Sequence, residues 1–362
     1  MTTAIYNFSA GPAMLPRPVL ERAREEMLSL RGIGTSVMEI SHRSPEFEAV
    51  RHAAEDGLRT LMGLGEDHEV LFFQGGATLQ FSIVPMNLLG AGEFADHIIT
   101  GSWSEKAANE AARYGSARVI YTSKEGGFRT VPQPNEFAID PQAAYVHYTS
   151  NETIDGVEFK YDLDGGGVPV VCDASSNILS KPFDPAKYAL IYAGAQKNIG
   201  PSGVTVVIIR KDMVDRVASG LSPVMDYRRS AAEHSMVNTP NTWGIYLISL
   251  VCDWLEDHGG VDAMAMRNKE KAAILYNAID GSDGFYAGHA EPAARSLMNV
   301  TFRLPSPELE ELFLADAESE GMVGLRGHRS VGGIRASIYN AFPRKGVEAL
   351  ADLMGHFISR RG

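Results

Sequence analysis

The sequence has little cysteine and no long apolar run, and each absence excludes a class of protein. Cys172 and Cys252, both in apolar segments, are the two cysteines among 362 residues. They do not suggest a disulfide framework, so we expect a reducing, cytoplasmic location. Neither has a metal-ligand spacing, so no metal site is predicted. No apolar run is long enough to cross a bilayer, and the N-terminus lacks the basic stretch and apolar core of a secretory signal.

Positive charge is also scarce. The 33 Lys and Arg residues face 45 Asp and Glu residues, which leaves a formal charge of -12. This balance disfavours nucleic acid and anionic membranes as partners, and an anionic substrate would need a local basic pocket. The hydrophobic share of 44% and the charged share of 22% are typical of a globular protein. The chain is long enough for one large or two smaller domains with a substantial core.

Strand-like and helix-like segments alternate over most of the chain, which predicts a sheet with helices on both faces. The expected strands are 70–73, 97–103, 119–121, 145–149, 168–173, 188–192 and 204–209, and the expected helices include 18–30, 47–61, 79–89, 105–114 and 242–255. Ligands of such sheets bind beyond the carboxyl ends of the strands. Residues 257–260 predict a boundary, followed by a smaller unit with a helix 261–279, a strand 298–303 and a helix 307–320.

A lysine and an aspartate follow neighbouring apolar segments. Lys197 lies among small residues between the strands 188–192 and 204–209, and Asp173 ends the strand that begins at Val168. A pyridoxal phosphate enzyme needs an amine to bind the cofactor aldehyde and a carboxylate to keep the pyridine nitrogen protonated. Lys197 and Asp173 are suitable for these roles. Each also has an ordinary interpretation, because a solvated lysine in a surface turn and an aspartate that caps a helix give the same local patterns.

A glycine turn follows the strand 70–73 and precedes a helix. Its sequence, Gln74-Gly-Gly-Ala-Thr78, predicts free backbone N–H groups at a helix start, with the Thr78 hydroxyl beside them. Such a turn suits a cofactor phosphate, although glycine turns are common in α/β proteins. It lacks the Gly-Lys-Ser/Thr of a nucleotide P-loop and the spacing of a dinucleotide fingerprint, so neither ATP nor NAD is indicated.

Three further residues have both a functional and a structural interpretation. Trp103, expected at a strand end, can stack its indole on a flat cofactor ring or pack in the core. His42 and Arg43 precede the helix 47–61, where a basic pair can bind an anion, cap a helix or form a surface ion pair.

Together these segments resemble the phosphoserine aminotransferase family, in the class V branch of the fold type I pyridoxal phosphate enzymes. The resemblance runs the whole length of the chain and is carried by the segments 7–16, 34–43, 151–156, 173–176, 192–201 and 327–340. It implies a large domain, residues 16–257, with a mostly parallel seven-stranded sheet flanked by helices. It also implies a smaller α/β C-terminal domain, residues 258–362, joined by the N-terminal segment 1–15, and a homodimer with shared active sites.

The resemblance also implies roles for particular residues. Lys197 carries pyridoxal phosphate and Asp173 pairs with its pyridinium nitrogen. Further cofactor contacts are implied for Ala77, Thr78, Trp103, Thr153 and Gln196, and for Asn238 and Thr239, which reach the neighbouring subunit's cofactor. Substrate contacts are implied for Ser9, His42, Arg43, His328, Arg329 and Arg335. Thr78 departs from some members of the family, which carry arginine at that position.

The implied reaction is reversible transamination between glutamate and 3-phosphohydroxypyruvate, which gives O-phospho-L-serine and 2-oxoglutarate in serine biosynthesis. Part of the family also acts on 4-phosphohydroxy-L-threonine in pyridoxine biosynthesis, and the sequence does not decide this second activity. One alternative is another class V enzyme, but a cysteine desulfurase needs a cysteine after Cys252, and an alanine-glyoxylate type aminotransferase does not need two His-Arg pairs. A noncatalytic pyridoxal phosphate-binding regulator is disfavoured by the negative charge and the lack of a visible DNA-binding segment.

Overall fold

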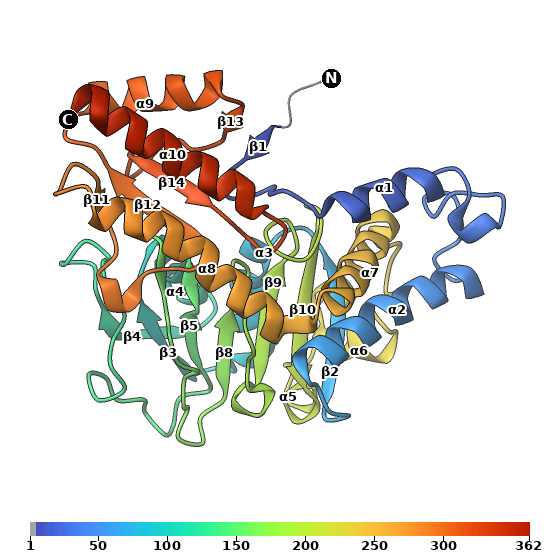
Figure 1. Ribbon diagram of the computed structural model, residues 1–362. Coiled ribbons are helices and arrows are strands. Elements are labelled where there is room, and N and C mark those ends of the chain that lie inside the picture. The colour runs from blue at the N-terminus through green and yellow to red at the C-terminus, as the bar shows by residue number, and fades with distance from the viewer. Residues whose placement is uncertain (1–4) are drawn as a thin grey trace.

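A seven-stranded sheet forms the centre of the molecule (Figure 1). The computed structural model describes residues 5–362. The strands, in their spatial order, are β2 (His68–Gln74), β10 (Val204–Arg210), β9 (Leu190–Gly194), β8 (Val170–Asp173), β5 (Val146–Thr149), β3 (Phe94–Ile99) and β4 (Ser116–Thr122). Only β10 runs antiparallel to its neighbours in this sheet. The prediction of a mostly parallel seven-stranded sheet is therefore confirmed.

Helices cover both faces of this sheet. The helices of the chain are α1 (Arg17–Glu26), α2 (Pro45–Met62), α3 (Ala77–Leu88), α4 (Ser102–Ala111), α5 (Lys211–Asp215), α6 (Tyr227–Ala232), α7 (Thr242–Asp257), α8 (Gly260–Asp280), α9 (Pro307–Ser319) and α10 (Arg344–Arg361). Residues of α1, α2 and α7 pack in the core on one face, and residues of α3 to α6 pack on the other. Both faces of β10 are covered, because Val206 belongs to the first core and Val207 to the second, and this explains why five of its seven residues are Val or Ile.

Most expected element boundaries differ from the structure by a few residues, and two of the differences have a local cause. The helix expected over 18–30 ends at Glu26, and Leu30–Gly32 form a separate 3-10 turn in which Arg31 has a φ of 47°. Trp103 does not end a strand, because β3 stops at Ile99 and Trp103 lies in the first turn of α4. The helix starts before its predicted residue because its N-terminus is capped from elsewhere in the chain.

The C-terminal part has its own core and a small sheet of β11 (Ala287–Gly288), β12 (Asn299–Arg303) and β14 (Ile334–Ser337). Helix α8 contributes to the large core through Met264 and to this second core from Ala272 onwards. Strand β1 (Tyr6–Asn7) pairs with β13 (Met322–Val323), so the N-terminal segment is attached to the C-terminal unit. The division at 257/258 stays a prediction, and residues 1–4 of the predicted linking segment lie outside the described residues.

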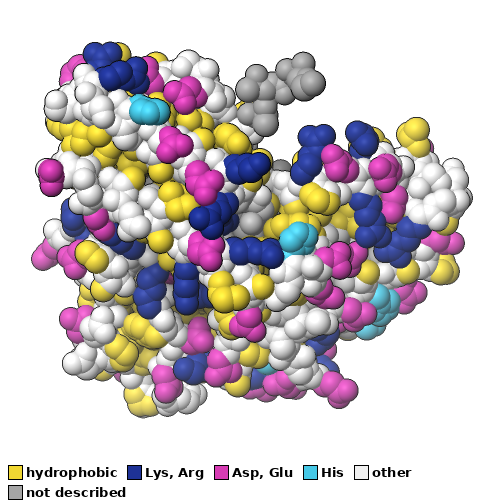
Figure 2. Space-filling view, in the orientation of Figure 1, with side chains coloured by type: hydrophobic (Ala, Val, Ile, Leu, Met, Phe, Trp, Pro, Cys, Tyr) yellow, Lys and Arg dark blue, Asp and Glu magenta, His cyan; other side chains and the backbone are white. Residues whose placement is uncertain are grey.

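Charged side chains of both signs are interspersed over the face of the molecule shown in Figure 2, with hydrophobic side chains between them. Among residues 5–362, no helix combines the length and apolar character that crossing a membrane would need.

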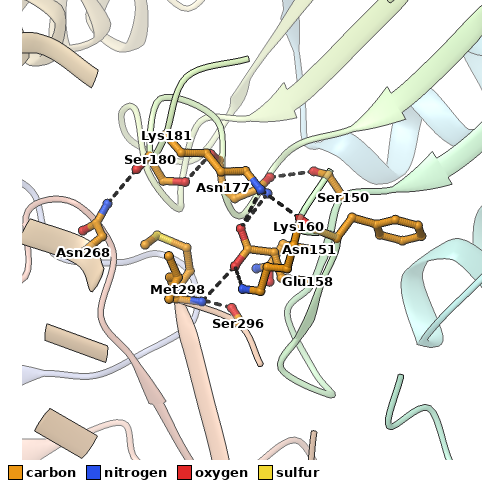
Figure 3. A network of polar contacts seen from close by, with 12 residues as sticks. Ser150, Asn151, Glu158, Lys160, Asn177, Ser180, Lys181, Asn268, Ser296 and Met298 are labelled. Atoms are coloured by element: carbon orange, nitrogen blue, oxygen red, sulfur yellow. Dashed lines mark hydrogen bonds and ion pairs between the residues drawn. The ribbon is translucent and has the colours of Figure 1, made fainter. Parts of the chain in front are cut away.

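A short hairpin joins the large sheet to the C-terminal unit. It consists of β6 (Asn151–Glu152) and β7 (Val157–Glu158). The Glu158 carboxylate is buried and lies 3.1 Å from both Lys160 Nζ and Lys181 Nζ, while the Leu297 N–H donates to it at 2.9 Å (Figure 3). Burial alone would raise the pKa of Glu158, but the two lysine charges outweigh it and hold the pKa at about 2. This cluster fixes the hairpin between the two parts of the chain.

We expect Glu158→Gln to lower the free energy of unfolding near neutral pH by about 2 kcal/mol, since the change removes both ion pairs while the lysines keep some access to water. The depressed pKa adds stability above the ordinary glutamate value, and this stability is lost as the pH falls towards about 2. The deficit should therefore shrink in urea unfolding at about pH 3.5 compared with pH 7. The exposed change Glu125→Gln is the control, and an equal deficit at both pH values would contradict the assignment.

Candidate active site

Lys197 lies in the loop between β9 and β10, at one end of the central sheet. Its side chain is partly buried, and its Nζ donates a 2.5 Å hydrogen bond to Thr153 Oγ1. The same Nζ lies 5.6 Å from the centre of the Trp103 ring. Burial lowers the pKa of Lys197 to about 8, although the negative charges of Asp173 and Glu152 oppose this effect. A solvated surface turn is therefore excluded, and the amine is available in its neutral form near neutral pH.

Asp173 ends β8, the strand next to β9, and pairs in register with Tyr192. Its buried Oδ1 accepts hydrogen bonds from the Ser175 N–H at 2.9 Å and the Ser175 hydroxyl at 2.6 Å. Burial raises the pKa of Asp173, and the charge of Lys197 works against this increase. The chain makes a turn after Asp173 rather than a helix, so the ordinary helix-cap interpretation is wrong. Lys197 and Asp173 share one electrostatic environment.

The glycine turn after β2 meets the loop of Lys197. Helix α3 begins at Ala77, directly after Gly76, which has no side chain to cap the first turn. A Cβ placed on Gly194 would lie 2.7 Å from Gln196 Oε1 and 3.3 Å from Ala77 N, so these two groups converge on one small space. Gln196 Oε1 is buried without a hydrogen-bond partner within residues 5–362. The N–H groups at the start of α3, the hydroxyl of the exposed Thr78 and the Gln196 amide nitrogen are the donors that can hold an anion there, whereas the Gln196 Oε1 is an acceptor.

Arg335 brings positive charge to the site from β14 in the C-terminal unit. It is partly buried, and its Nη1 donates a long hydrogen bond of 3.5 Å to Thr153 O. Its Nε is buried and has no partner in the described part of the chain. Burial lowers the pKa of Arg335, against the influence of Tyr339 and Asp155. A partly desolvated guanidinium with an unused N–H is suited to a carboxylate ligand.

Ser9 lies beside Arg335's strand. The carbonyl of Phe8 accepts a 3.2 Å hydrogen bond from the Ser337 N–H of β14. Ser9 is also packed tightly against Gly324, because a Cβ at that glycine would lie 2.4 Å from Ser9 Oγ. The structure therefore places Ser9 at the edge of the same site.

The predicted basic pairs are not brought together within one chain. His328 and Arg329 lie in the connection between β13 and β14, and the pKa of His328 is lowered by burial and by the charges of Arg335, Lys106 and Arg329. His42 and Arg43 lie in the connection between α1 and α2, which Figure 1 shows at the opposite side of the molecule from β14. The His42 Nε2 is buried without a partner within the described chain.

Asn238 and Thr239 are exposed and lie between α6 and α7. The Thr239 carbonyl accepts a hydrogen bond from the Gln74 side chain, so this segment lies close to the glycine turn of its own chain. Both side chains are available at the molecular surface.

Sequence reasoning missed three charged residues around Lys197. Glu152 and Asp155 belong to the quoted segment 151–156, and burial raises the pKa of Glu152 to about 7 and that of Asp155 to about 6. Lys106 Nζ lies 4.2 Å from the centre of the Trp103 ring. Two acids within a short, otherwise uncharged segment were the available signal. The residues that these acids contact lie on other elements, so the segment alone could not identify them.

The site lies beyond the carboxyl ends of parallel strands, where open α/β sheets bind ligands. An amine of lowered pKa, a buried carboxylate and an anion cradle converge there. This fold and site are those of the pyridoxal phosphate-dependent transferases of fold type I.

Comparison with known proteins refines this class. Residues 5–350 match the family Aminotransferase class-V. The phosphoserine aminotransferase of Geobacillus kaustophilus is 54% identical over 355 residues, which are 98% of each chain. That of Pseudomonas paraeruginosa is 51% identical over the full length of both chains, 362 residues. The chain belongs to the class-V aminotransferase family and, within it, to the phosphoserine aminotransferases.

Solved structures agree with this placement. The phosphoserine aminotransferase from Bacillus circulans subsp. alkalophilus has a TM-score of 0.97 and 48% identity, with 99% of each chain covered. The enzyme from Trichomonas vaginalis, crystallised with pyridoxal phosphate bound, has a TM-score of 0.92 and 39% identity over 97% of this chain and 100% of its own. The predicted family and fold class are confirmed.

We expect Lys197 in the protein without added cofactor to react with an amine-selective acylating reagent with a midpoint near pH 8, because burial disfavours its ammonium form. Peptide mapping by mass spectrometry would follow Lys197 apart from the other lysines. In urea the midpoint should rise to the model-peptide value of about 10.4. A free amine in the same sample corrects for reagent decay, and identical midpoints in folded and unfolded protein would overturn the assignment.

Proposed function

We propose that the protein is a phosphoserine aminotransferase, which transfers an amino group between glutamate and 3-phosphohydroxypyruvate and so makes O-phospho-L-serine and 2-oxoglutarate. The identity to proteins of that name over the whole chain supports this reaction. The observation that carries it is the convergence of a lysine amine, a buried aspartate and an unpaired arginine N–H in one site. Serine biosynthesis is the corresponding role, and 4-phosphohydroxy-L-threonine is a possible second substrate class within the same proposal.

The residues present fit pyridoxal 5'-phosphate. The space shared by Gln196 and the start of α3 suits its phosphate, with Ala77 and Thr78 as donors. Asp173 would pair with the ring nitrogen, Thr153 with the ring oxygen, and Trp103 would stack on the ring. When bound, the cofactor supplies an electron sink for the bonds of the substrate's α-carbon.

The protein's own groups then position and move protons. Lys197 Nζ, neutral in part near pH 8, would accept the proton of the substrate's α-carbon, and Thr153 Oγ1 holds this amine in place through the 2.5 Å hydrogen bond. Ser175 donates two hydrogen bonds to one oxygen of Asp173, and these bonds and the charge of Lys197 favour the ionised carboxylate against the burial that raises its pKa. We assign to Arg335, with Ser9 beside it, the binding of the substrate's α-carboxylate. This contact orients the bond that is broken at the substrate's α-carbon.

The side-chain phosphate of the substrate carries a charge of roughly -1.5 to -2 near neutral pH and needs several cations. His328 and Arg329 lie near Arg335, and we assign them to this pocket. The connection between α1 and α2, which carries His42 and Arg43, lies far from β14 in its own chain (Figure 1), which supports a second copy as the source of this pair. We therefore propose a homodimer with shared active sites, in which Asn238 and Thr239 reach the neighbouring copy's cofactor phosphate. The buried thiols Cys172 and Cys252 support a cytoplasmic location.

The function is tested with purified protein, added pyridoxal phosphate, phosphoserine and 2-oxoglutarate. We expect glutamate to form, and serine or alanine to be poor donors because they leave the cationic pocket empty. Arg335→Lys should lower kcat/KM for phosphoserine about 100-fold, because a lysine cannot hold a carboxylate in a bidentate way. Lys197→Ala should be inactive, and the exposed Lys345→Ala is the control. No turnover of phosphoserine by a cooperatively folded sample would refute the function.

The shared site is tested by mixing two inactive variants, Lys197→Ala and Arg43→Ala. If Arg43 serves the neighbouring site, each mixed dimer holds one intact site. Random reassociation should then restore about a quarter of the wild-type activity. Each variant mixed with itself is the control. Unchanged inactivity, with mixed dimers demonstrated by tagged subunits, would place Arg43 in the same chain's site or outside it.

A further inference from the structure

Glu152 is a fully buried acid that makes no ion pair with a lysine, arginine or histidine in the part of the chain that the structure describes. Its carboxylate instead accepts three hydrogen bonds from the first turn of α4. The Trp103 N–H donates to Oε2 at 3.0 Å, and the Ser104 N–H and hydroxyl donate to Oε1 at 2.8 Å and 2.6 Å. Both carboxylate oxygens thus accept hydrogen bonds from the first turn of α4.

The N-cap residue of helix α4 has no side chain, although Ser104 within the first turn accepts a 3.2 Å hydrogen bond from the Gly101 N–H. The helix begins after Gly101, whose φ of -179° is extended backbone that any residue can adopt. A Cβ on Gly101 would nevertheless lie 2.4 Å from Glu152 Cδ. The carboxylate of Glu152 therefore occupies the space that an N-cap side chain would fill, and this space, not the backbone angle, requires glycine.

Glu152 also connects two parts of the site, the backbone of Trp103 and the residue that binds Lys197. The next residue, Thr153, accepts the hydrogen bond from Lys197 Nζ, while Glu152 holds the backbone of Trp103. The hairpin that carries both is closed by a 2.9 Å hydrogen bond from Gly156 N–H to Glu152 O. Asp155 adds a further, longer contact of 3.4 Å to the Ser102 N–H. Trp103 and Lys197 are thereby placed from one rigid segment.

We propose that Glu152 is a positioning residue, which caps α4 from the hairpin and so fixes the Trp103 indole over the cofactor ring. The inference rests on the proposed function, because it deepens the account of the same site. If the cap only stabilised α4, a local side chain would be sufficient. Glu152 instead lies next to Thr153, the hydrogen-bond partner of Lys197, and so links the start of α4 to the lysine.

The first test compares cofactor affinity with stability. Replacing Trp243 and Trp254 by phenylalanine leaves Trp103 as the only tryptophan. Titration with pyridoxal phosphate should then quench its fluorescence. We expect Glu152→Ala to weaken this binding about tenfold or more and to lower kcat with little change in KM, since one cap and one stacking contact are each worth about that factor. Glu152→Gln, which keeps the shape and one acceptor, should fall in between.

The matched control is Ser306→Ala. Ser306 caps α9, far from the site in the C-terminal unit, by accepting from the Leu309 N–H at 3.3 Å. This change should lower the melting temperature as Glu152→Ala does, but leave the affinity for pyridoxal phosphate and the Trp103 emission unchanged. If Glu152→Ala behaves in the same way as Ser306→Ala, Glu152 is structural only and the proposal is wrong.

A second pair of variants keeps the test independent of folding losses. Gly101→Ala should be damaging in the wild type and tolerated in Glu152→Ala, because the carboxylate is no longer in the way. Gly101→Ser combined with Glu152→Ala should regain part of the cofactor affinity by supplying a local cap. Equal damage from Gly101→Ala in both backgrounds would overturn the proposal. Failure of the wild type to bind pyridoxal phosphate would instead overturn the proposed function.

Discussion

The structure depends on the burial of two glutamates in one short hairpin. Burying a carboxylate costs free energy unless its oxygens accept hydrogen bonds or pair with cations. The hairpin 151–158 provides such partners in two ways. Glu158 is held by Lys160 and Lys181 and bonds to the C-terminal unit. Glu152 has no such cations and is held by the start of α4. The hairpin is therefore fixed to three other elements, and Thr153 between these acids inherits a fixed position.

This constraint explains how the site is both apolar and reactive. Lys197 and Asp173 come from neighbouring strands at one end of a sheet that is buried on both faces. Burial favours the neutral form of each group, and their mutual attraction favours the charged forms. The balance lowers the pKa of Lys197 to about 8 and leaves the pKa of Asp173 above its ordinary value, although two hydrogen bonds from Ser175 favour its ionised form. Arg335 adds a cation that the chain leaves partly unpaired.

Local patterns in the sequence predicted the sheet, most helices and the residues nearest to the chemistry. Most residues of Val204–Arg210 are apolar because both faces of β10 are covered, and the helical spacing over 47–61 correctly indicated α2. The start of α4 escaped prediction because its cap is not local. The helix has glycine at its N-cap, and the acceptor of the Trp103 N–H lies 49 residues further along the chain.

The sequence by itself determined the class of fold, the family and the lysine, aspartate and glycine-turn motifs, because each rests on residues that are neighbours in the chain. Tertiary structure alone decided the partners of the buried acids, such as the contact between Glu158 and Leu297 across 139 residues. It also decided that His328 lies near Arg335 while His42 lies elsewhere. The physical reason is that burial and pairing of charge depend on distances in space, which hydrophobic periodicity and turn residues do not record.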